Sequence, residues 1–137
     1  MVFTPRGGVF QRFARDAVER DAIRAVGNER VRWPLVHNED LAGLYVLALE
    51  RAPAGSSYLG AAIEGLAVGR IARAFASRFG TRHPEPEIVA TDAIASEFGE
   101  WAGGCALDQQ LSGAKARGDL GWSPRHLDPE GEIARLS

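Results

Sequence analysis

Residues 31–62, VRWPLVHNEDLAGLYVLALERAPAGSSYLGAA, contain the clearest structural pattern in the chain. Residues 35–37 form a short extended run. Leu41, Leu44, Tyr45 and Ala48 then follow at i, i+3, i+4 and i+7, the spacing of one helical face. An Ala-Gly-Ser turn leads to a short apolar strand at 57–62. A strand, a helix and a second strand joined by short connections favour parallel strands in an α/β layered fold.

The helix at 38–52 should be a buried one. Asn38 is suited to cap its first turn, where Glu39 and Asp40 complement the helix dipole. Val46 and Leu49 extend the apolar surface beyond a single stripe. We therefore expect this helix to be covered on more than one side.

The same stretch resembles the C-terminal half of the extended short-chain dehydrogenases, the NAD-dependent epimerase/dehydratase family. The matching segments are VHNEDLA at 36–42 and AGSSY at 54–58. A second match is LDQQLSGAKA at 107–116, followed by LGWSPR at 120–125, which is similar to the family's ending. A third is VFTPRGG at 2–8, which resembles the segment that follows the family's active site. The three matches occur in the family's order.

The resemblance implies an α/β fold that is a truncated extended short-chain dehydrogenase. We expect a few parallel strands with flanking helices and a small, mostly helical C-terminal subdomain. Residues 1–137 would form one domain, equivalent to the family's substrate-binding half. The implied function is the substrate-binding portion of an NAD(P)-dependent epimerase, dehydratase or reductase.

The family's chemistry needs a glycine-rich strand-to-helix turn for the dinucleotide and a tyrosine with a lysine four residues later. Neither motif is present: Leu49 follows Tyr45 by four, Ala62 follows Tyr58 by four, and Leu111 precedes the single lysine, Lys115, by four. We therefore predict no catalytic residues and no cofactor for the isolated chain, although complete relatives use NAD or NADP. Whether the chain is part of an enzyme stays open.

Three residues near the start of the segment 31–62 are candidates for substrate binding: Arg32, Trp33 and His37. In the family an arginine near this point often contacts a substrate phosphate, although its usual place is one residue nearer the histidine. The alternative assignments are surface charge for Arg32, core packing for Trp33 and a local hydrogen bond for His37.

Other reactive side chains give no pattern of their own. Cys105 has no neighbouring base in the sequence, so a small, partly buried side chain is the simpler interpretation. His83 and His126 lack the spacing of metal ligands, and we predict no metal site.

Charge and composition exclude some classes of protein. The net charge is -2, and the 16 basic residues are scattered among acids, which argues against nucleic-acid binding. The longest apolar run, 44–49, is too short to cross a membrane, and no leader segment is evident. One cysteine cannot form an internal disulfide, which fits a cytoplasmic protein.

The expected strand at 57–62 contains neither charge nor proline to protect its edge. We therefore expect a homo-oligomer, or a partner chain that covers the exposed sheet, besides a small-molecule substrate. A different class of function, a non-catalytic protein-interaction module, also fits. A neighbouring reading frame that encodes the missing motifs would favour the enzyme, and its absence the module.

Overall fold

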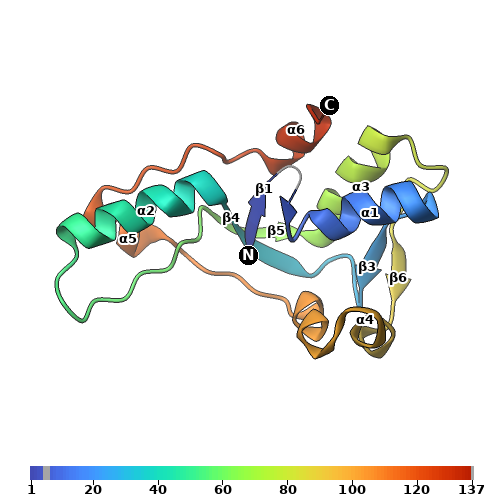
Figure 1. The fold of residues 1–137 in the computed structure, drawn as a ribbon, viewed down its shortest axis with the longest axis horizontal. Helices are drawn as coiled ribbons and strands as arrows, with labels where there is room; N and C mark the ends of the chain where they lie inside the picture. The colour runs from blue at the N-terminus through green and yellow to red at the C-terminus, as the bar shows by residue number, and fades with distance from the viewer. Residues whose placement is uncertain (5–6, 137) are drawn as a thin grey trace.

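The computed structural model describes residues 1–4 and 7–136 (Figure 1). Pro5 and Arg6, within the third matching segment, lie outside the described residues. The elements in chain order are β1 (Val2–Thr4), β2 (Gly7–Gly8), α1 (Gln11–Arg20), β3 (Arg24–Val26), β4 (Arg32–His37), α2 (Asn38–Arg51), β5 (Ile63–Ala67), α3 (Val68–Phe79), β6 (Glu87–Val89), α4 (Thr91–Phe98), the 3-10 helix η1 (Glu100–Ala106), α5 (Ala114–Leu120) and α6 (Pro129–Ala134).

Two sheets organise the fold. The larger has the strand order β2-β1-β4-β5, and the smaller pairs β3 with β6. β1 runs parallel to β4, with Val2 opposite Val36, and β3 runs parallel to β6, with Ala25 opposite Ile88. The expected α/β class with parallel pairs is confirmed, although the larger sheet is mixed.

The predicted strand at 57–62 is wrong. This segment has no strand, and the next strand is β5, which pairs antiparallel with β4. The reason is the direction of α2, which continues away from the sheet beyond β4, so that the chain must return along the helix before it re-enters the sheet (Figure 1). Ala61 and Ala62 are nevertheless buried, since the returning segment packs against neighbouring elements.

The main core lies where α1 and α3 pack against the sheets. It is rich in aromatic side chains that are at most 1% exposed: Phe3, Phe10, Phe13, Trp33 and Phe75. α1 and α3 have strongly one-sided apolar patterns, because each presents a single hydrophobic stripe to this core.

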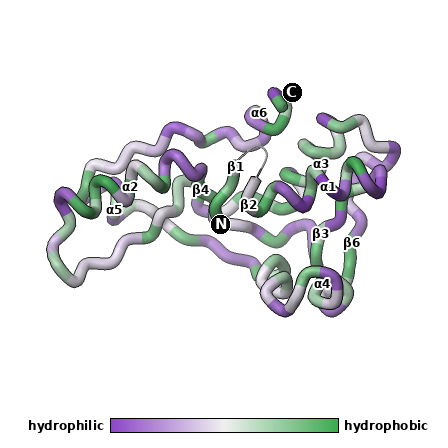
Figure 2. Tube along the Cα trace, viewed as in Figure 1, coloured by the Kyte–Doolittle hydropathy of each residue, from purple (hydrophilic) through white to green (hydrophobic). Residues whose placement is uncertain are grey.

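A second, smaller cluster joins α2 to α5 in an arm that projects from the sheet (Figure 1). Leu44 and Trp122 are buried there, but Tyr45, Val46 and Leu49 of α2 are 66%, 53% and 89% exposed. The expectation that α2 is covered on more than one side is therefore wrong. Figure 2 shows hydrophobic residues along α2, and only the face toward α5 and the returning segment is covered.

The C-terminal part is mostly helical, as expected, but its helices do not form one subdomain. α4 and η1 lie beside β3 and β6, α5 packs on α2, and α6 packs on α3 (Figure 1). Each helix buries its apolar residues against a different part of the fold: Ile94 in a small third cluster, Leu120 in the arm and Ile133 in the main core. Among the described residues, no helix combines the length and hydropathy needed to cross a membrane.

Candidate functional site

The three predicted binding residues lie on β4 but do not converge on one site. Arg32 is at the exposed beginning of the strand. Its guanidinium forms a bidentate salt bridge with Asp108, with Nε 3.2 Å from Oδ1 and Nη2 3.0 Å from Oδ2. The hydrogen bond to Asp108 raises the pKa of Arg32 and lowers that of Asp108. A substrate phosphate would have to displace this carboxylate, so substrate contact by Arg32 stays a prediction.

Trp33 and His37 are both buried. The Trp33 ring is 1% exposed, and its Nε1 atom donates to the carbonyl oxygen of Cys105 at 3.0 Å. His37 is 5% exposed at the junction of β4 and α2. Its Nδ1 atom accepts from the backbone N–H of Glu39 at 3.3 Å, so His37, and not Asn38 as expected, caps α2.

Trp33 also lines a pocket of about 300 Å³ between α1, β4 and the segment from Phe98 to Cys105, which we call the α1 pocket. Its other apolar walls include Val9, Phe98 and Trp101. Arg12 and Arg15, one turn apart on α1, also line it. A concave, mostly apolar space with a few polar groups is the usual form of a small-molecule site.

Arg12 is the most unusual group of this pocket. Its side chain is 11% exposed, and its Nη1 atom donates to the backbone oxygen of Arg24 at 3.0 Å. Its Nη2 atom is buried and has no hydrogen-bond partner among the described residues. Burial lowers the pKa of Arg12, and the nearby charge of Asp16 opposes that shift. An incompletely paired buried cation is costly, which makes Arg12 a candidate ligand-binding group.

Cys105 lies at the same pocket, but its chemistry is not nucleophilic. Burial raises the pKa of the Cys105 thiol, so the thiol is neutral near pH 7. This agrees with the interpretation of Cys105 as a small, partly buried side chain.

A cluster of polar side chains, the histidine cluster, joins His37 to His126 and Glu132 of the C-terminal segment. The rings of His37 and His126 are stacked, with centroids 3.8 Å apart and planes at 15°. Nδ1 of His126 is 2.9 Å from a Glu132 oxygen, and its Nε2 atom is 3.4 Å from Glu39. The potential ligand atoms of His37, His126 and Glu132 lie within 4.8 Å of one another.

This arrangement suits ion pairs between His126 and the neighbouring carboxylates better than a metal ion. Stacked rings direct their nitrogen lone pairs along parallel planes instead of toward one point. His37 Nδ1 already accepts the cap bond from the Glu39 N–H, and its Nε2 atom lies 3.8 Å from a Glu132 oxygen. Both nitrogens of His126 face carboxylates, the setting of an imidazolium.

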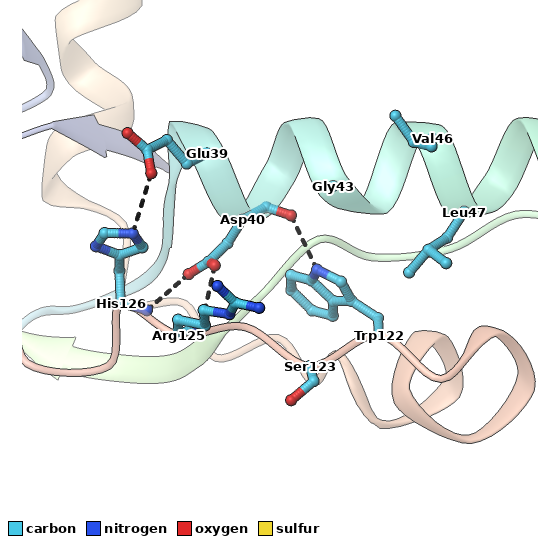
Figure 3. A pocket seen from close by; sticks show the side chains of 9 residues that line it. All are labelled: Glu39, Asp40, Gly43, Val46, Leu47, Trp122, Ser123, Arg125 and His126. Carbon is cyan, nitrogen blue, oxygen red and sulfur yellow. Dashed lines mark hydrogen bonds and ion pairs between the residues drawn. The ribbon is translucent and has the colours of Figure 1, made fainter.

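Beside this cluster is an open pocket of about 470 Å³ between α2 and the segment from Trp122 to His126 (Figure 3). The Asp40 carboxylate accepts from the backbone N–H groups of Arg125 and His126, each at 2.9 Å. Trp122 Nε1 donates to the Asp40 carbonyl oxygen at 2.9 Å. These bonds hold the C-terminal segment onto α2, so we interpret this region as a structural joint.

The histidine cluster predicts a pH-dependent stability. Burial disfavours the charged His126, but the Glu132 hydrogen bond and the charges of Glu132, Asp40 and Glu39 outweigh it and raise the pKa. A raised folded pKa adds stability that is complete below the unfolded value of about 6.5 and is lost as pH rises through the folded pKa. In urea unfolding, His126→Gln should therefore destabilise the protein more at pH 5.5 than at pH 8.5.

The control for this prediction is Glu132→Gln, which removes the main acceptor and keeps the size of the side chain. In that background, His126→Gln should show a weaker dependence on pH. An equal loss of stability at both pH values in the original background would contradict the prediction.

Two strand-to-helix junctions, those of β4 with α2 and of β5 with α3, do not fit the pyrophosphate of a dinucleotide. A pyrophosphate needs free N–H groups at a helix N-terminus that follows a strand. At the junction of β4 and α2, Glu39 and Asp40 would repel it. At the junction of β5 and α3, the N–H groups of Val68 and Gly69 already donate to Val31 and Glu29 at 2.8 Å each.

The α1 pocket was not predicted from the sequence. Its walls come from three separate segments, and no pattern along the chain relates Arg12 to Trp101. The only local sign is the pair of arginines at 12 and 15, whose spacing of three residues places them on one face of α1.

No family model matches the chain. The chain is 36% identical over 102 residues to Uncharacterized protein C2A9.02 of Schizosaccharomyces pombe, a match that covers 74% of this chain and 33% of that protein. It therefore spans about a third of the length of this curated relative.

The fold is similar to that in the crystal structure of gox2253, with a TM-score of 0.63 and 19% sequence identity. The superposition covers 94% of this chain and 42% of the gox2253 chain. At this identity the likeness shows a shared fold. Nearly the whole α/β arrangement described above thus recurs within a longer chain.

Proposed function

We propose that this chain is the substrate-binding portion of an NAD(P)-dependent epimerase-, dehydratase- or reductase-like protein of the extended short-chain dehydrogenase type, inactive alone. The observation that carries the proposal is the α1 pocket, a concave site that includes Trp33 and the incompletely paired Arg12. The order of the three matching sequence segments supports it. So does the recurrence of this fold within a chain of which it makes up 42%.

The proposal predicts that the isolated chain does not bind NADH or NADPH in the low micromolar range. The junction of β4 and α2 is acidic, and the first N–H groups at the junction of β5 and α3 are already bonded, so neither of these two junctions supplies the contacts that orient a pyrophosphate. Calorimetric titration of each cofactor should give only heats of dilution. Saturable micromolar binding would contradict the prediction.

The proposal as a whole is tested in the DNA around the gene. We expect a neighbouring reading frame to encode a glycine-rich strand-to-helix turn and a Tyr-x3-Lys pair. Co-expression of that frame with this chain should yield a complex that binds NAD(P)H, while this chain alone does not. Absence of such a frame, or a partner that fails to associate, would favour a function without dehydrogenase chemistry.

A non-catalytic protein-interaction module is the second candidate. It is favoured by the strip of Tyr45, Val46 and Leu49, which are exposed on one side of α2. The expected association through an exposed strand at 57–62 loses its basis, because that strand does not form. The free edge of β5 is partly covered, since Leu111 N–H donates to the Glu64 oxygen at 3.0 Å. A homo-oligomer or a partner chain would therefore use α2.

A further inference from the structure

The α1 pocket lies beside a concentration of positive charge that the net charge of the chain conceals. Four arginines meet where α1 faces β3 and α4, and they share three carboxylates; the arginines are Arg12, Arg15, Arg20 and Arg24, and the acids are Asp16, Glu19 and Glu97. One positive charge is therefore in excess here, in a protein with a net charge of -2. The excess lies next to the pocket, because Arg12 and Arg15 line it.

The two lining arginines are placed differently. Arg12 lies in the buried part, 11% exposed, where a low dielectric strengthens its field. Arg15 is 49% exposed at the mouth, and its bonds to Glu19 and Glu97 are 3.2 and 3.4 Å long. Arg15 is therefore able to turn toward an incoming anion, and Arg12 supplies a positive charge behind it. Cys105, whose thiol is neutral, adds no competing negative charge.

The remaining walls suit a flat apolar ring. Trp33 has its N–H bonded to the Cys105 carbonyl oxygen and is 1% exposed, so it closes the inner end of the pocket and leaves little surface for a ligand. Phe98 lies under the guanidinium of Arg15, whose Cζ atom is 5.2 Å from the ring centroid. Trp101 is 69% exposed, an unusual position for a side chain of this size, and it lines the same pocket. Phe98 and Trp101, the two aromatic walls with exposed surface, favour offset-stacked or edge-on contact with an aromatic ligand.

We infer that the α1 pocket binds a small aromatic carboxylate, with its ring against Phe98 and Trp101 and its carboxylate toward Arg15 and Arg12. The volume of about 300 Å³ is at the lower end of ligand sites, which limits the ligand to one or two rings. A monoanion matches the single excess positive charge, whereas a phosphate would bring more charge than the site balances. The inference rests on the proposed function insofar as it names the substrate class of that portion.

The test is calorimetric titration of the full chain with sodium 2-naphthoate and with its neutral analogue 2-naphthamide. The naphthoate should bind saturably, and the amide at least about tenfold more weakly, because it lacks the charge that the arginines pair with. Trp101→Ala, at an exposed position, should also weaken naphthoate binding about tenfold without loss of fold, as checked by circular dichroism.

Matched arginine variants locate the site. Arg15→Gln should weaken naphthoate binding about tenfold, whereas Arg20→Gln should leave it unchanged within about twofold. Arg20 is on the same helix, is 47% exposed and also pairs with Glu97, but it does not line the pocket. Equal affinity for acid and amide, equal effects of the two arginine variants, or no saturable binding below about 1 mM would each overturn the inference.

These outcomes are separable from the test of the proposed function. If the chain binds naphthoate but no cofactor-binding partner exists, the inference about the pocket stands and the dehydrogenase assignment is contradicted. If a cofactor-binding complex forms but does not bind naphthoate, the dehydrogenase assignment stands and the inference of an aromatic carboxylate ligand is contradicted.

Discussion

Replacement of Asp16 with asparagine is expected to lower the free energy of unfolding by about 3–5 kcal/mol. Asp16 is 1% exposed and pairs with Arg24, which is 6% exposed. The carboxylate accepts from Arg24 Nη2 at 2.7 Å, from Nε at 3.1 Å and from the backbone N–H at 3.2 Å. The hydrogen bond to Asp16 is the largest cause of the raised pKa of Arg24, and the hydrogen bond to Glu97 is the second.

The loss is large because the cation remains. Asparagine is nearly isosteric with aspartate, so packing changes little, but Arg24 would keep its charge in a buried position with only Glu97 to balance it. Arg12 would lose its carboxylate partner as well. A typical domain is stable by only about 5–15 kcal/mol, so this variant should approach the limit of folding.

Urea unfolding followed by circular dichroism measures the effect. The matched control is Glu19→Gln on the same helix, which removes a pair with Arg15 whose side chains are 49% and 58% exposed. That change should cost less than about 1 kcal/mol. A loss below about 1 kcal/mol for Asp16→Asn would mean that water reaches the network and that it is not a buried ion pair.

Phe75→Ala is expected to have an effect of similar size, about 3–5 kcal/mol. The Phe75 ring is fully buried in the main core. Its centroid is 5.6 Å from that of Phe10, 5.7 Å from Phe13 and 6.2 Å from Phe79. Truncation therefore removes a large buried apolar area and opens a cavity. The cavity is not filled completely, because α1, α3 and the sheet are packed against one another and can shift only a little.

Phe79→Ala is the control for that prediction, because Phe79 follows one turn later on α3 but is 39% exposed. Its loss should be less than half that of Phe75→Ala, by the same urea measurement. Equal losses would show that the aromatic cluster does not centre on Phe75.

Elements with local signals could be predicted from the sequence. α6 begins with such a signal: the Asp128 carboxylate accepts from the Gly131 N–H at 2.9 Å, and Pro129 lies in the first turn. α3 ends at Phe79, and Gly80 follows with a φ of 65°, the left-handed conformation that glycine adopts readily. In each case residues adjacent in the chain decide the conformation.

The segment at 57–62 could not be assigned in this way. Its alanines are buried, as in a strand, but by close approach to the region before α5, where a Cβ on Gly113 would be 2.4 Å from the Ala61 oxygen. Burial without a strand ladder has the same sequence pattern as burial in a sheet. The difference depends on the direction of α2, along which the chain must return before it re-enters the sheet (Figure 1).

The candidate site was predictable only in part, for the same reason. Trp33 does line a pocket, but Arg32 is paired with Asp108, and His37 is stacked on His126. Both partners come from segments far along the chain. The sequence does not show that Arg12 and Arg15 line a pocket, because the opposite wall is η1, which lies far from α1 in the chain.

Strand β4 is shared by two cores: Leu35 belongs to the main one, and the adjacent Val36 belongs to the smaller one in the arm. The consequence is a hierarchy of local opening. Loss of the smaller cluster would free α5 and the outer part of α2 while α1, α3 and the inner face of β4 remained packed. The arm is thus a low-energy cooperative unit attached through one strand to a more stable one, and transient opening would start at its outer end.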